Sequence, residues 1–207
     1  MELGMMDAEK NLTEEAIRMV IQEVTVGIVQ TCCYIVSRED GDECIVIDPG
    51  AEAERIRKAA GEKRIAAILL THGHFDHIGA VQALWDAAEQ KPRIIIHQLD
   101  APMLRDPVLN AGMGLLRRAV TAPEATDTVK EGDALELAGL AVKVLHTPGH
   151  TPGSSCYEIG GELFTGDTLF EYGWGRTDLP GGSEEQMEAS LNRLMPLARS
   201  MPIHPGH

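Results

Sequence analysis

Four side chains that commonly bind metals lie within six positions of the chain: His72, His74, Asp76 and His77. Three histidines this close repel one another when protonated, and they leave polar nitrogens without partners when neutral and buried. A divalent cation removes both difficulties, because imidazole and carboxylate are its ordinary ligands. On an extended segment His72, His74 and Asp76 would point the same way. The spacing therefore predicts a metal site, with a polar surface loop as the alternative.

Three later segments, each containing glycine, add further candidate ligands. The first, residues 146–153, contains two histidines, and position alone leaves open whether His146 or His150 binds metal. We favour His150, because it lies inside the rigid Pro-Gly loop. The second segment contains Asp167, which is a candidate to bridge two cations, with a turn cap as the alternative. The third segment places His207 at the end of the chain.

The elements that must position these residues follow from the apolar pattern. Short runs rich in Val, Ile and Leu predict strands at residues 19–29, 32–37, 44–47, 65–70, 93–97, 135–137, 141–146, 155–159 and 162–165. Helix-forming segments predict helices at residues 51–60, from about residue 81, and from a capping box at Ser183 to Pro196. Residues 98–120 are irregular and predict a helix with a mobile lid. Two sets of strands, each followed by helices, predict two packed sheets with helices outside.

Length and charge narrow the class of protein. The chain has 207 residues, which suits one domain, and 43% of them are apolar. Its formal net charge is −14 and it has no Lys/Arg-rich run, which argues against nucleic-acid binding. No apolar run is long enough to span a membrane, and the acidic N-terminus does not resemble a secretory signal. The four cysteines form no CxxC pair, so we expect buried thiols in a reducing cytoplasm. A small-molecule substrate is the expected partner.

Four motifs occur in a fixed order along the chain. They are HxHxDH from His72, PGHTPGS from Pro148, GDTLF from Gly166 and PGH from Pro205. This ordered set resembles the metallo-β-lactamase superfamily, and the resemblance covers the chain from about Val24 onward. It implies an α/β fold, a four-layer αββα sandwich with metals at one edge between the sheets, in a single domain over residues 1–207.

The resemblance also implies a binuclear metal centre. It assigns His72, His74 and His150 to the first ion, Asp76, His77 and His207 to the second, and Asp167 to both. Asp76 and His77 are in addition the expected catalytic residues. Zinc suits this shell, with iron and manganese as alternatives. Asp48 resembles a buried aspartate that braces the ligand loop in this superfamily.

One stretch narrows the resemblance within the superfamily. Residues 166–183 resemble glyoxalase II-like hydrolases of the short bacterial type, which implies cleavage of a thioester such as a hydroxyacylglutathione by a metal-bound hydroxide. Arg176 falls near the place where those enzymes bind glutathione, and an ion pair between Arg176 and Asp178 is the alternative. Superfamily members usually continue past the last motif, so either a C-terminal segment is missing or His207 lies on a frayed end.

A second activity shares most of these motifs. Persulfide dioxygenases resemble this chain and use one iron, held by the equivalents of His72, His150 and Asp167. In them an aromatic residue follows the GRTD segment, whereas Leu179 stands there in this chain. This difference favours the hydrolase.

Overall fold

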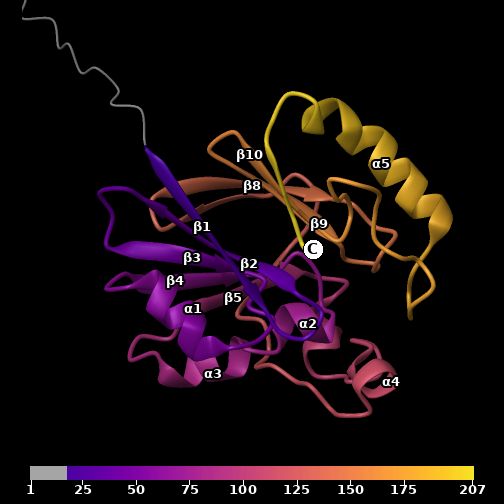
Figure 1. The fold of residues 1–207 in the computed structure, drawn as a ribbon. Coiled ribbons are helices and arrows are strands. Elements are labelled where there is room, and N and C mark those ends of the chain that lie inside the picture. Colours follow the sequence, from indigo (N-terminus) through magenta and orange to yellow (C-terminus); the bar gives the residue numbers. More distant parts are fainter. Residues whose placement is uncertain (1–17) are drawn as a thin grey trace, which may run out of the picture.

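Two β-sheets pack face to face in the computed structural model, which describes residues 18–207, and helices cover their outer faces (Figure 1). The first sheet holds six strands in sequence order: β1 (Met19–Val26), β2 (Thr31–Arg38), β3 (Glu43–Ile47), β4 (Arg64–Leu69), β5 (Arg93–His97) and β6 (Asp127–Val129). Strands β1 to β3 pair antiparallel, and β3 to β6 pair parallel. Parallel neighbours need crossovers, which contain α1 (Ala53–Ala60) and, for the next pair, α2 (Phe75–Ile78) and α3 (Val81–Ala87).

The second sheet has its strands in the order β11 (Ile203–Pro205), β10 (Glu162–Gly166), β9 (Ser155–Ile159), β8 (Leu140–His146) and β7 (Ala134–Leu137). Its neighbours pair antiparallel, except that β10 and β11 are parallel. The long helix α5 (Glu184–Ala198) connects those two strands and lies over the outer face of the sheet (Figure 1). As predicted, Ser183 caps this helix, and its Oγ accepts a hydrogen bond from the Gln186 N–H at 3.3 Å.

Alternation along β2 shows how the strands divide their side chains between apolar layers. Cys33 and Ile35 belong to the core between the first sheet and helices α1 and α3. Tyr34 and Val36 belong to the core between the two sheets. A third apolar layer packs the second sheet against Leu194 of α5. Three such layers separate four layers of structure, which confirms the predicted αββα sandwich.

The predicted end of the last helix is wrong. Pro196 lies inside α5, which continues to Ala198, and the Arg199 N–H still donates to the Met195 carbonyl at 3.2 Å. A proline removes one N–H donor and disfavours helix around it, but it does not have to end a helix. Here the carbonyl that loses its donor is that of Asn192, which is exposed to water.

The predicted helix within residues 98–120 is broken into two short pieces. These are the 3-10 helix η1 (Ala101–Leu104) and α4 (Gly112–Leu116). Pro107 lies between the two pieces, and proline strongly disfavours a continuous helix. Of the methionines in this segment, Met103 is buried, whereas Met113 is 44% exposed.

None of the helices between residues 18 and 207 is long and apolar enough to cross a membrane. The predicted absence of a secretory signal concerns residues 1–17, which lie outside the described residues.

Candidate metal centre

The candidate ligands lie just beyond the carboxyl ends of four strands. His72 and His74 follow β4, His150 follows β8, Asp167 follows β10 and His207 follows β11. Strands β4, β8, β10 and β11 come from both sheets, so the sandwich brings together loops that are far apart in the sequence.

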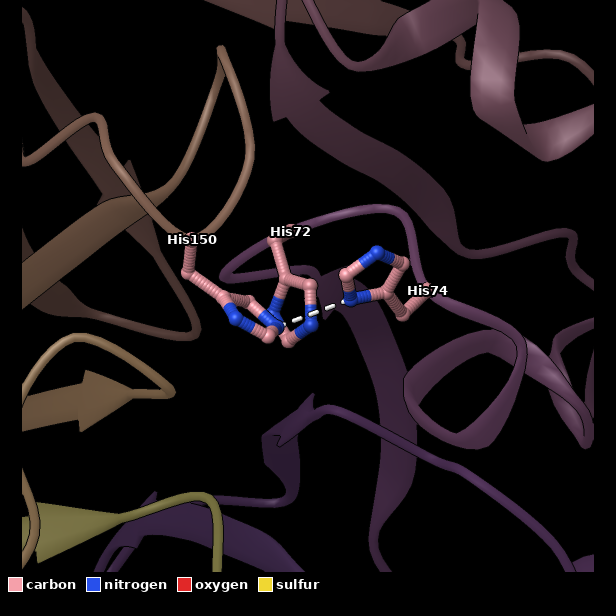
Figure 2. Close-up of side chains that lie close together, drawn as sticks. All are labelled: His72, His74 and His150. Carbon is pink, nitrogen blue, oxygen red and sulfur yellow. Dashed lines mark hydrogen bonds between the residues drawn. The ribbon is translucent and has the colours of Figure 1, made fainter. Parts of the chain in front are cut away.

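The first ligand group consists of His72, His74 and His150, whose rings converge from two loops (Figure 2). Each offers a nitrogen within 4.8 Å of the other two, and His74 Nδ1 lies 2.8 Å from His150 Nε2. All three side chains are buried. Three imidazole nitrogens at this spacing suit one divalent cation.

The second ligand group consists of Asp76, His77 and His207, whose ligand atoms also lie within 4.8 Å of one another. His207 Nε2 is 3.4 Å from Asp76 Oδ2, and His77 Nε2 is 3.8 Å from the same oxygen. His77 is buried, Asp76 is half-buried and His207 reaches solvent. This group is therefore more open than the first.

Asp167 lies between the two groups. Its Oδ2 is 3.4 Å from His150 Nε2 in the first group, and its Oδ1 is 3.4 Å from His77 Nε2 in the second. Gly206 allows this placement, because a Cβ there would lie 2.3 Å from Asp167 Oδ1. One carboxylate oxygen thus faces each group, as a bridging ligand requires.

The donor atoms themselves fit a metal centre. Four buried side-chain atoms of the site have no hydrogen-bond partner among the described residues: Nε2 of His72, His74 and His77, and Oδ1 of Asp167. Each unsatisfied buried polar group costs about 1–3 kcal/mol, so a fold that keeps four of them together needs a compensating interaction. Cations would provide it at His72 Nε2, His77 Nε2 and Asp167 Oδ1. His74 faces His150 with its Nδ1, so its unpartnered Nε2 lies on the other side of the ring.

Protonation differs between the two groups. Burial, and after it proximity to His150, lowers the pKa of His74 to about 3. Burial likewise holds the pKa of His72 well below its usual value. For His77 burial also lowers the pKa, but Asp167, Asp48 and Asp76 outweigh it and raise that pKa well above normal. His72 and His74 are therefore neutral imidazoles, whereas His77 attracts a proton.

A family model described as the metallo-beta-lactamase superfamily matches residues 26–207. This protein belongs to the metallo-beta-lactamase superfamily. Its members are generally hydrolytic enzymes that bind divalent metals. Hydroxyacylglutathione hydrolase GloC from Haemophilus influenzae is 34% identical to the chain, over 91% of each protein.

Solved structures of superfamily proteins agree with the fold. The B3 metallo-beta-lactamase BLEG-1 superposes with a TM-score of 0.84 at 35% identity, over 91% of both chains. The protein TTHA1623, solved in a di-iron-bound form, gives 0.78 at 37% identity, over 90% of this chain and 91% of its own. ETHE1 from Myxococcus xanthus gives 0.72 at 28% identity, over 91% and 75%.

Asp48 supports the second group, as the superfamily resemblance implies. Its carboxylate accepts hydrogen bonds from the Thr71 N–H at 2.8 Å and from the Thr71 hydroxyl at 2.5 Å. Its Oδ2 also lies 2.9 Å from His77 Nδ1. An Nδ1–H donated to Asp48 leaves His77 Nε2 free to face a cation.

The sequence reasoning missed Asp100, a buried carboxylate that joins the two ligand loops of the first group. Its Oδ2 accepts hydrogen bonds from the Gly73 N–H at 3.1 Å and the Thr151 hydroxyl at 2.6 Å. Its Oδ1 accepts one from the Gly153 N–H at 2.6 Å. The signal that points to it is its position past the end of buried β5, at the same edge of the sheet as the ligands.

The extended-loop argument is wrong for Asp76. His74 has an extended backbone, but α2 begins at the next residue, so Asp76 and His77 lie together in one helical turn. His146, the alternative to His150, lies outside both ligand groups. Its Nε2 is 2.8 Å from the Pro152 carbonyl, and its ring stacks on His97 with centroids 4.1 Å apart.

Arg176 forms the ion pair that was the alternative to glutathione binding. Its Nε and Nη2 donate to the two carboxylate oxygens of Asp178 at 2.6 and 2.7 Å. Its carbonyl lies 2.7 Å from His150 Nδ1, so the backbone of Arg176 orients a ligand of the first group. Arg176 is also one of the residues that line the cavity over the centre.

A cavity of about 260 Å³ opens over the centre. It is lined by Val29, His74, Phe75, Asp76, Leu115, His150, Asp167, Phe170, Gly175, Arg176, Leu179 and His207. Every titratable side chain of this lining, apart from Arg176, is a candidate metal ligand. The cavity therefore offers substrates the metal centre itself and a mostly apolar rim.

Proposed function

We propose that this protein is a hydrolase with a binuclear metal centre that cleaves a thioester, with zinc as the metal. The observation that carries this proposal is the convergence of two ligand groups on a shared carboxylate, where His72 Nε2, His77 Nε2 and Asp167 Oδ1 are buried and otherwise unpartnered. Hydroxyacylglutathione is the reference substrate, because the relative from Haemophilus influenzae is named for it.

The residues of such a site have different roles in the reaction. Two divalent ions, when bound, supply Lewis acidity and lower the pKa of water toward about 7. Asp167 holds the two groups in register, and Asp48 orients His77. We propose that Asp76 and His77 orient the attacking oxygen at the second group.

The cavity also matches the leaving group of a thioester. A thiolate with a pKa of about 8.5 leaves without a strong general acid. Among the described residues that line the cavity, the acid-base side chains are all candidate ligands, so none is left to protonate a poor leaving group. A lactam nitrogen or an alkoxide needs such help more than a thiolate does.

Metal analysis together with a substrate panel tests the proposal. We expect about two ions per chain, hydrolysis of S-lactoylglutathione or a simple acyl thioester, and weaker turnover of lactams and phosphoesters. Protein that carries two ions and leaves every thioester intact would show that the proposed reaction is wrong.

A mononuclear iron dioxygenase that acts on persulfides is the second candidate. The similarity to ETHE1 from Myxococcus xanthus, at 28% identity, keeps this candidate open. Leu179 after the GRTD segment favours the hydrolase, because an aromatic residue follows that segment in the persulfide dioxygenases that the chain resembles. One iron per chain with oxygen uptake on persulfide addition would support the dioxygenase instead.

The net charge and the cysteine content bear on the class of substrate and on the cellular location. The net charge of −14 supports a small-molecule substrate rather than nucleic acid. All four cysteines are free thiols, which supports the proposed cytoplasmic location.

A further inference from the structure

We infer that, among thioesters, the site selects a short apolar acyl group carried on an uncharged thiol and disfavours thiols that carry carboxylates. This inference rests on the proposed thioester hydrolysis and names its substrate class. Two independent features of the cavity lead to it: an apolar rim and the absence of an uncompensated cation among the described residues that line it.

The rim is apolar and comes from separate parts of the fold. Val29 lies in the β1–β2 turn, Leu115 in α4, and Phe170 and Leu179 in the long loop after β10. Val29 is 43% exposed and Leu115 is 52% exposed, although both border the cavity. Exposed apolar side chains around a hollow with a polar floor are typical of a site that buries an apolar ligand group.

The size of the cavity limits the acyl group. About 260 Å³ is below the range of roughly 300–1,000 Å³ that is typical of sites for drug-sized ligands. The metal centre occupies the floor, so the remaining space suits a few methylene groups rather than a long chain.

The charges near the rim disfavour an anionic thiol carrier. Arg176 is the one Lys or Arg among the described residues that line the cavity, and its charge is matched by Asp178. A neighbouring hollow shares His207 and Phe170 with the cavity and is lined by Glu23 and Glu171. Glutathione carries two carboxylates and one ammonium group, so its net charge is negative. Its carboxylates would therefore find no free cation at the rim, and its net charge would meet two glutamates beyond His207.

Matched thioesters test the inference on the metal-loaded protein. The probes are acetyl, butyryl and hexanoyl thioesters of N-acetylcysteamine, which is neutral, and of glutathione. We expect kcat/KM to rise by up to about fourfold for each added CH2 group until the cavity is filled. For the same acyl group, the neutral thiol should be preferred by about threefold or more.

Higher kcat/KM on the glutathione thioesters, or no dependence on acyl length, would overturn the inference and leave the proposed hydrolysis standing. If the protein holds two ions and cleaves neither series, the proposed function itself is wrong, and the inference is overturned with it.

Two variants with matched controls test separately the effect of the apolar rim on acyl-chain preference and the effect of the Arg176 charge on thiol preference. Val29→Ser should lower kcat/KM for the hexanoyl thioester about threefold relative to the acetyl one. Val20→Ser is the control, because Val20 is 45% exposed on β1 and does not line the cavity. An equal effect of both substitutions on chain-length preference would contradict the role of the rim.

Asp178→Asn frees the charge of Arg176 and should shift preference toward the glutathione thioester by about twofold to fivefold. Asp40→Asn is its control, since Arg38 forms the same forked pair with Asp40 at 3.0 and 2.9 Å in the β2–β3 turn, at the far end of those strands. An unchanged preference in Asp178→Asn would show that the Arg176–Asp178 pair does not set thiol specificity.

Discussion

The two ligand groups differ in how the fold surrounds them. His72, His74 and His150 are buried, and Asp100 ties together the loops on which they lie. In the second group His207 reaches solvent, and its Nδ1 lies 3.1 Å from the Val29 carbonyl at the β1–β2 turn.

This difference has a consequence for metal binding. Burial keeps the imidazoles of His72 and His74 neutral, whereas three carboxylates hold protons on His77. A cation competes with protons only where the free ligand is basic, so the first group binds its ion with less proton competition. We therefore expect a tight first ion and a weaker, pH-sensitive second ion.

Removal of a ligand from the first group should have the largest effect. His150→Ala is expected to lose the first ion and to lower kcat by more than about 100-fold, because the cation supplies most of the activation of water. His146→Ala is the matched control and should keep most of the metal, since His146 lies outside both groups. Metal content after gel filtration and the rate of thioester hydrolysis measure both. The reverse result would reassign the ligand to His146.

Substitution of the two bracing carboxylates, one at a time, should weaken the binding of one ion more than that of the other. Asp100→Asn places an amide N–H against backbone N–H donors and should weaken binding of the first ion by about 10–100-fold. Asp48→Asn should weaken the second ion by a similar factor, through His77. Competition with a chelator measures each affinity. Equal losses at both sites in both variants would mean that the two groups are not braced separately.

Lower pH should release the second ion first. The pKa of His77 is raised by its aspartate neighbours despite burial, and that of His207 is raised by Asp76 and Asp167 despite burial, so protons displace the cation there as the pH falls. The pKa of His74 is lowered to about 3, so protons do not compete there until far lower pH. Metal content is expected to fall from about two ions to about one as the pH falls below the raised pKa values of His77 and His207. Simultaneous loss of both ions would contradict the expected difference in proton competition between the two ligand groups.

The smallest effect is expected from the side-chain cap of α5, because its removal leaves the Ser183 N–H bonded at 2.8 Å to the Gly149 carbonyl beside His150. Ser183→Ala removes the side-chain cap of α5 and should lower the free energy of unfolding by about 1 kcal/mol. Chemical denaturation measures this loss, and metal content should stay the same. A change in the ratio of the two ions would show that α5 couples to the centre.

Most strands, the main helices and the order of the sandwich layers could be predicted from the sequence, because apolar periodicity is a local signal. The short strands β6 and β11 were not predicted, since three residues carry too little of that pattern. The small helix α2 could not, since four residues carry too little pattern to be told from a loop. Its presence changes how Asp76 reaches the second group. The bracing role of Asp100 was also invisible, because its hydrogen-bond partners Gly73, Thr151 and Gly153 come from two other loops.

The sequence alone determined which residue types are available for metal chemistry and, by the order of its motifs, the superfamily. It also placed His72 and His74 near each other, because residues two apart on one loop cannot separate far. Only the tertiary structure decided that His150, Asp167 and His207 face them, since strands of two sheets must pack before those loops meet. Burial and neighbouring charge then set the protonation of each imidazole. Those are properties of the surrounding residues, and no spacing along the chain contains them.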